Sequence, residues 1–153
     1  YIALMGNHEE MACDGTWQIE DEPDVDKEKK YTSWMAGLPR YYTEGNTVFV
    51  HAGIDEEAED LWELGTSEYF FSQKYSAKTG RFYKNIKIVA GHIGTAEISG
   101  NQDFHDIYYD GESHYYIDGT VTESGIIPVL MVDTDTDKYY RVLESGMQII
   151  FPY

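Results

Sequence analysis

The chain has 153 residues, of which 42% are hydrophobic and 15% aromatic, which is enough for one globular domain with a sizeable core. Its 28 acidic and 11 basic residues give a formal net charge of −17, a surface that repels nucleic acid and anionic membranes. No apolar run reaches the ~20 residues of a membrane helix, and the lone Cys13 excludes an internal disulfide. These features predict a cytoplasmic protein with neither nucleic acid nor membrane as a partner.

The first forty residues are predicted to contain one strand and two helices. The apolar run at residues 1–6 is typical of a strand, and residues 8–18 favour a helix that opens at a Gly-Asn-His-Glu turn. Residues 31–38 are predicted as a helix that ends at a Gly and a Pro. Between the two helices, residues 20–30 combine high charge with Pro23, which indicates an exposed excursion.

The middle of the chain is predicted to alternate strand and helix, and the last third to be a β meander. Strands are expected at 47–51 and 86–90, with a helix over 66–77 between them. Short segments rich in β-branched and aromatic residues follow, at 105–109, 114–118, 126–133, 138–143 and 147–151. The pairs Asp110-Gly111, Asp118-Gly119 and Ser145-Gly146 separate them, which is typical of antiparallel hairpins. The fold class predicted is therefore α/β (α+β).

Three polar groups follow short apolar runs, at the points where predicted strands end. They are Asn7 in Gly6-Asn7-His8-Glu9, His51 in Val50-His51-Ala52-Gly53, and His92 after Gly91. Loops at strand ends are where α/β proteins hold their ligands. An amide and two imidazoles provide O and N donors that suit Mn, Fe or Zn. The sequence therefore predicts a metal site formed by Asn7, His51 and His92.

In this order the three motifs resemble the calcineurin-like metallophosphoesterase superfamily, in particular the bacterial branch of the Ser/Thr protein phosphatases. The resemblance implies a two-sheet α/β/β/α sandwich that ends in an antiparallel β meander. The family pattern begins with D-x-H and G-D-x-x-D-R-G, and neither occurs in this sequence. Residues 1–153 are therefore expected to be one incomplete metallophosphoesterase domain, its C-terminal part, weakly active or inactive by itself.

The resemblance also implies roles for the motif residues. The intact enzyme would use two divalent metals, with Mn expected and Fe or Zn as alternatives. Asn7 and His51 would ligate the second metal, His92 the first, and His8 would be the general acid. Such metals bind the phosphoryl oxygens and activate water, while a histidine protonates the leaving group. Asp118-Gly119 is similar to the family's I-D-G block, which shapes the floor of the site.

The sequence departs from the protein phosphatases at two positions that grip phosphate. An Arg usually precedes G-N-H-E, where this chain has Met5, and another follows a Trp, whereas Trp62 precedes Glu63 and Leu64. Between Glu68 and Glu97 there is no acidic residue, and five cations fall there: Lys74, Lys78, Arg81, Lys84 and Lys87. Such a run is usually a solvated face; the alternative hypothesis is that Arg81 supplies the missing phosphate contact.

Three functions remain open at this point. The first is a metal-dependent phosphomonoesterase that acts on a phosphorylated protein or a small phosphoester. The second is a hydrolase of a nucleotide phosphoanhydride such as diadenosine tetraphosphate, and the third is a catalytically inactive binding domain. A truncated sandwich would expose apolar sheet surface, which predicts self-association. His105 and His114 are predicted to be structural or exposed.

Overall fold

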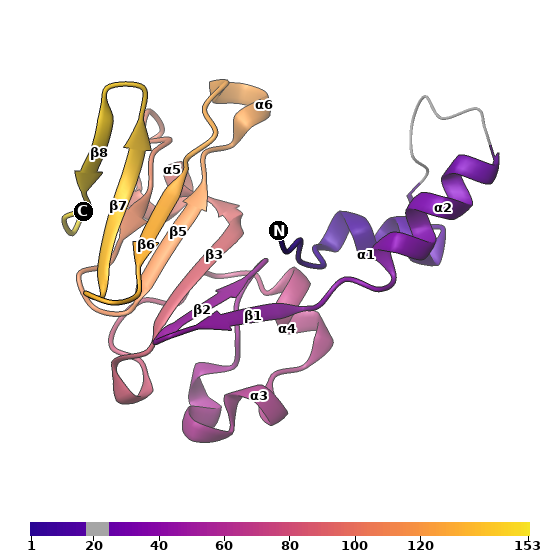
Figure 1. The fold of residues 1–153 in the computed structure, drawn as a ribbon, viewed down its shortest axis with the longest axis horizontal. Helices are drawn as coiled ribbons and strands as arrows, with labels where there is room; N and C mark the ends of the chain where they lie inside the picture. The colour runs from indigo at the N-terminus through magenta and orange to yellow at the C-terminus, as the bar shows by residue number, and fades with distance from the viewer. Residues whose placement is uncertain (18–24) are drawn as a thin grey trace.

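The computed structural model describes residues 1–17 and 25–153, which form a mixed α+β fold with two separate sheets. The chain starts with two helices, α1 (Asn7–Asp14) and α2 (Val25–Met35), which extend away from the sheets on one side (Figure 1). Within the described part, no helix is long and apolar enough to cross a membrane.

The larger sheet has five strands in the order β1-β2-β3-β5-β4. They are β1 (Tyr41–Glu44), β2 (Thr47–Val50), β3 (Lys87–Gly94), β4 (Tyr108–Tyr109) and β5 (His114–Asp118). The three central strands, β2, β3 and β5, are parallel to one another, and each outer strand is antiparallel to its neighbour. The C-terminal ends of the central strands therefore lie at one edge of the sheet.

The smaller sheet is an antiparallel meander of β6 (Leu130–Asp133), β7 (Lys138–Leu143) and β8 (Gly146–Ile149). The predicted meander is thus confirmed for its last three strands, with β7 at its predicted bounds. The Asp133 carboxylate accepts hydrogen bonds from the N–H groups of Asp135 and Thr136, at 3.1 and 3.2 Å, in the hairpin turn. The stacked rings of Tyr115 and Tyr139, 4.5 Å apart, join this sheet to the larger one.

Apolar side chains cover both faces of the larger sheet. Ile88 and Ala90 of β3 face a core that includes Val48, Trp62 and Phe71, whereas Val89 belongs to the cluster that contains Tyr139. The connections that follow β2, β3 and β5 along the chain contain short helical segments: η1 (Glu56–Leu61), α3 (Trp62–Gly65), α4 (Glu68–Gln73), η2 (Tyr83–Asn85), α5 (Thr95–Ser99) and α6 (Val121–Ser124).

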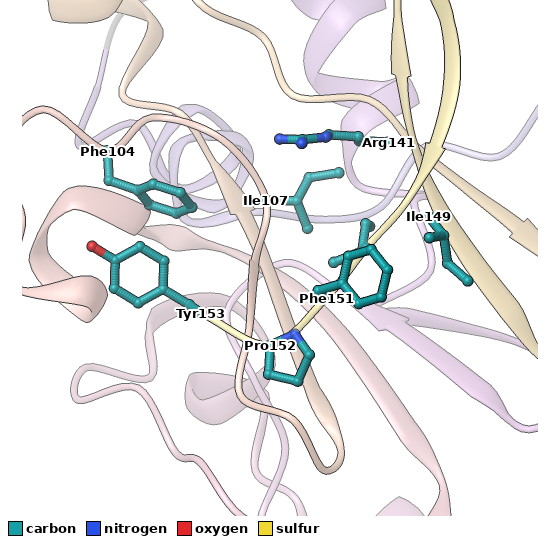
Figure 2. A pocket seen from close by; sticks show the side chains of 8 residues that line it. Phe104, Ile107, Arg141, Ile149, Phe151, Pro152 and Tyr153 are labelled. Atoms are coloured by element: carbon teal, nitrogen blue, oxygen red, sulfur yellow. The ribbon is translucent and has the colours of Figure 1, made fainter.

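The C-terminal residues fold back against the loop after α5. They enclose a cavity of about 150 Å³ lined by Phe104, Ile107, Arg141 and residues 149–153 (Figure 2). The Phe104 and Tyr153 rings are 4.5 Å apart, and Arg141 is paired with Asp106. None of the motif residues lines this cavity.

Several predicted elements of the first half differ in the structure. Residues 1–6 form no strand, and β1, which was not predicted, occupies the outer position beside β2. The first helix ends at Asp14 rather than residue 18, since Gly15 adopts a left-handed conformation with φ 78°. The second begins at Val25, so residues 25–30 are helical rather than irregular, and residues 20–24 lie outside the described residues. The helix predicted over 66–77 is the shorter α4.

Two predictions for the second half were also wrong in part. The last third is not wholly antiparallel, because β5 pairs in parallel with β3. Asp118-Gly119 leads into α6 and is not a hairpin turn, whereas Asp110-Gly111 and Ser145-Gly146 do connect antiparallel strands. The strand predicted at 86–90 extends to Gly94, so His92 lies within it.

Candidate functional site

The structure brings Asn7, His51 and His92 together at the C-terminal edge of the larger sheet. The Oδ1 atom of Asn7 lies 2.9 Å from Nε2 of His51. The rings of His51 and His92 are 5.2 Å apart, inclined at 60°. His51 follows β2 and hydrogen-bonds through its carbonyl to the Gly91 N–H at 2.8 Å, which aligns the ends of β2 and β3. The three residues therefore form one polar cluster, drawn from segments that are far apart in the sequence.

Gly6 allows the start of α1 to approach this cluster. A Cβ atom at Gly6 would lie 2.8 Å from Nδ1 of His51 and 2.6 Å from a carboxylate oxygen of Glu9, so a side chain there would force His51 and Glu9 to shift. The Gly6 N–H donates to that Glu9 oxygen at 3.1 Å. Glu9 thus caps the first turn of α1, where a negative charge also suits the helix dipole.

His92 has a strained backbone. Its φ of 66° is in the left-handed region, and the pairing of β3 with β5 shifts register between Ala90 and Gly94 around it. A non-glycine residue in this conformation costs on the order of 1–3 kcal/mol, and such residues gather at functional sites. The bulge turns the His92 side chain toward the end of the sheet, where it meets His51.

Both histidines of the cluster are poised to be neutral. Burial lowers the pKa of His51, and a positive charge on His92 would lower it further, while Glu9 and Asp118 oppose the shift. Burial also lowers the pKa of His92, opposed by Asp118. Neutral imidazole is the form that ligates a metal ion. Asp118, at the end of β5, thus contributes negative charge to the cluster from the third central strand.

Two other predicted site residues are placed differently. The exposed His8 packs its ring 5.5 Å from that of Trp17, and its charge acts on both His51 and His92. Arg81 is not brought to the cluster. The residues beside it, Gly80 and Phe82, hydrogen-bond to Asp110 and Ser113 next to the start of β5, whereas His92 lies near the end of parallel β3.

The cluster opens into a cavity of about 330 Å³. His51, Gly91, His92 and Asp118 form its polar part, and its remaining wall is apolar, with Ile117, Gly119, Val121, Ile126, Ile127 and Pro128. None of the described residues that line it is a Lys or Arg. Within the described residues, no three or more His, Cys, Asp or Glu side chains are grouped so as to hold a metal ion. The cluster of Asn7, His51 and His92 is not such a group, because one of its three members, Asn7, is an amide.

Comparison of the chain with models of protein families, with characterised proteins and with solved structures found no significant match.

Glu10 is a further residue of the site region that sequence reasoning missed. Its carboxylate accepts hydrogen bonds from Ser72 Oγ at 2.6 Å and Gln73 Nε2 at 3.0 Å, and it forms an ion pair with Arg40. Burial alone would raise the pKa of Glu10, but these partners outweigh it and lower the pKa. Glu10 thereby ties α1 to α4. Because its partners are 30 to 63 residues away, no local pattern identifies it.

Replacing Glu10 with glutamine is expected to lower the free energy of unfolding by about 2 kcal/mol, because hydrogen bonds to a partly buried charge are lost. The matched control is Glu68→Gln, which removes the other carboxylate bound to Arg40. The Glu68 side chain is 80% exposed, against 18% for Glu10, so we expect a change below about 0.5 kcal/mol. Urea denaturation of both variants measures the difference. Equal losses in the two variants would show that Glu10 does not anchor α1.

Proposed function

We propose that this chain carries part of the active site of a metal-dependent phosphoester hydrolase of the protein-phosphatase type, built on the two-sheet metallophosphoesterase sandwich. The observation that supports this most directly is the 2.9 Å approach of Asn7 Oδ1 to His51 Nε2, beside His92, at the C-terminal edge of parallel strands. The order of the G-N-H-E, V-H-A-G and G-H motifs along the chain agrees with it.

The cluster suits a divalent cation. Two adjacent ligands at about 2.1 Å from one ion in octahedral coordination, which Mn favours, lie roughly 3 Å apart, which fits the distance between Asn7 Oδ1 and His51 Nε2. The lowered pKa of His51 keeps its imidazole free to ligate. A bound ion, expected to be Mn with Fe or Zn as alternatives, would polarise the phosphoryl group and acidify water. Two protein ligands are fewer than the four of a typical zinc site, so we expect weak binding.

This ion is the second metal of the predicted pair; His92 is assigned to the first metal beside it, and His8 to the leaving group. His8 directly follows Asn7 in the first turn of α1, so the two side chains point in different directions. While Asn7 holds the ion, His8 is free to donate a proton to the departing alkoxide, which is the role that histidine performs best near neutral pH. Its exposed position leaves room for that substrate oxygen.

The cavity favours a monoester over a nucleotide phosphoanhydride. A dinucleotide polyphosphate carries several negative charges, and each of them needs a cationic or N–H partner. No Lys or Arg lines the cavity, and the formal net charge of the chain is −17. We therefore propose a phosphomonoesterase, with a phosphorylated protein or a small phosphoester as substrate, and we no longer assign the phosphate contact to Arg81.

Calorimetric titration of the chain with Mn²⁺, followed by assay of p-nitrophenyl phosphate at saturating Mn²⁺, tests the proposal. We expect measurable Mn²⁺ binding and slow hydrolysis. His51→Ala should weaken Mn²⁺ binding at least tenfold and abolish hydrolysis, because it removes one of the two ligands. His105→Ala is the control, since it removes a histidine that does not line the cavity. Identical titrations of the wild type and the His51→Ala variant would refute the metal site.

A further inference from the structure

An apolar wall stands directly beside the histidine cluster, in the same cavity. It consists of Ile117 at the end of β5 and of Val121, Ile126, Ile127 and Pro128, on and after α6. Ile127 is 73% exposed, and Val121 and Ile126 are each 48% exposed. Isoleucine and valine are normally among the most buried residues. A contiguous group of exposed ones next to polar residues marks a binding surface.

The segment that carries this wall is held in shape by its own hydrogen bonds. Ser124 Oγ donates to the Gly119 carbonyl at 2.6 Å and accepts from the Ile126 N–H at 3.0 Å. The Gly125 N–H closes the helical turn on the Val121 carbonyl at 2.8 Å. The wall is therefore preformed, and a ligand that contacts it avoids the entropy cost of ordering a loop.

The polar groups of the cavity all lie at one end. Among the described residues that line it, only His51, His92 and Asp118 have side chains that ionise, and none is a Lys or Arg that could bind a second anionic group. A ligand that fits is thus compact and polar at one end and apolar at the other. A volume of about 330 Å³ is near the lower limit of ligand pockets, which suits a single ring rather than a nucleotide.

We infer that the site selects aryl phosphate monoesters, whose phosphate lies at the histidines and whose aromatic ring packs on Ile126, Ile127 and Pro128. This inference rests on the proposed phosphoesterase function and adds the class of alcohol that the substrate carries. A hydrophilic alcohol such as glycerol would leave the wall exposed to water and lose the favourable burial of apolar surface.

The test compares two phosphonates that cannot be hydrolysed, phenylphosphonate and methylphosphonate, at saturating Mn²⁺. Calorimetry on the chain should give a dissociation constant at least about tenfold lower for phenylphosphonate. In NMR spectra with labelled isoleucine methyl groups, phenylphosphonate should shift the signals of Ile126 and Ile127, and methylphosphonate should leave them in place.

The variant Ile127→Ser tests whether the apolar wall causes the preference for phenylphosphonate. Because Ile127 is largely exposed, the variant should fold, and the preference for phenylphosphonate should fall to about threefold or less. Ile2→Ser is the control: it alters a half-exposed isoleucine outside this cavity and should keep the tenfold preference. Equal affinity for the two phosphonates overturns the aryl preference and leaves the phosphoesterase proposal standing. Binding of neither phosphonate overturns both.

Discussion

Replacing Asp110 with alanine is expected to lower the free energy of unfolding by about 3–5 kcal/mol, because it breaks a buried charged network by removing one partner. The Asp110 side chain is 3% exposed and that of His114 is 2% exposed. The Asp110 carboxylate accepts hydrogen bonds from the N–H groups of Gly80, Glu112 and His114 at 2.7, 2.7 and 3.0 Å. It also lies 3.2 Å from Nδ1 of His114.

The His114 ring extends this network across the start of the sheet. Its Nε2 atom lies 3.4 Å from Glu56, which in turn is paired with Lys74. Alanine at position 110 would leave three backbone N–H groups and one side of the His114 ring without a carboxylate. The N–H groups of Gly80 and His114 are partly buried, and a buried donor that loses its partner costs about 1–3 kcal/mol, whereas the Glu112 N–H is exposed to water.

The pH dependence of stability should reveal the same network. Burial alone would raise the pKa of Asp110, but hydrogen bonds from the His114 ring and from the three N–H groups lower it from 3.8 to about 2. The ionised Asp110 carboxylate therefore stabilises the fold fully above pH 3.8, and this stabilisation is lost as the pH falls toward 2. Burial would lower the pKa of His114, but Asp110 and Glu56 outweigh it and raise the pKa above 6.5. The protonated His114 therefore stabilises the fold fully below pH 6.5, and this stabilisation is lost as the pH rises through the raised pKa.

The control for Asp110→Ala is Asp133→Ala. Asp133 also caps a hairpin turn by accepting backbone N–H groups, but the residue is only partly buried and these hydrogen bonds are exposed to solvent. We expect a loss below about 1 kcal/mol for this variant, as for an exposed cap. Urea denaturation from about pH 3 to pH 8 should show the difference between wild type and Asp110→Ala to be largest between about pH 4 and 6.5. A difference that does not change with pH would rule out a charged network. If Asp110→Ala does not fold, Asp110→Asn gives the same comparison with a smaller loss.

Gly119→Ala is expected to lower the free energy of unfolding by about 3 kcal/mol, the upper part of the range for overpacking a well-packed site. A Cβ atom at Gly119 would lie 2.6 Å from the Ile126 carbonyl oxygen and 2.9 Å from that of His105. Both are backbone atoms, so neither can rotate away as a flexible side chain would. The added methyl group must therefore displace the segment that carries the apolar wall of the cavity.

The control here is Gly37→Ala, whose Cβ atom would meet its nearest neighbour at an ordinary 3.5 Å. We expect a change within about 0.5 kcal/mol at this position. Thermal denaturation gives the two stabilities, and binding of phenylphosphonate reports on the cavity wall. If Gly119→Ala proved as stable as the wild type with an unchanged affinity, the close packing of the wall against Gly119 would be disproved.

The sequence itself predicted those parts of the fold that depend on local pattern. The apolar run of β2, the β-branched and aromatic strands β5 and β7, and the turns at Asp110-Gly111 and Ser145-Gly146 lie where their residues indicated. Asn7, His51 and His92 do lie together, as their positions after apolar runs indicated, although only His51 directly follows a strand: residues 1–6 form none, and His92 lies within β3. The metal, the reaction and the substrate stay predictions.

Other features depend on contacts between residues far apart in the chain, which no local pattern encodes. The antiparallel pairing of β1 with β2 is one such feature, and residues 1–6 form no strand despite their apolar run. The parallel pairing of β5 with β3 places Arg81 near the start of these strands and His92 near their end, although Arg81 and His92 are only eleven residues apart in sequence. Tertiary packing likewise buries His114 between two carboxylates and attaches Glu10 to α4, because only a folded chain can compensate a buried charge with partners from distant segments.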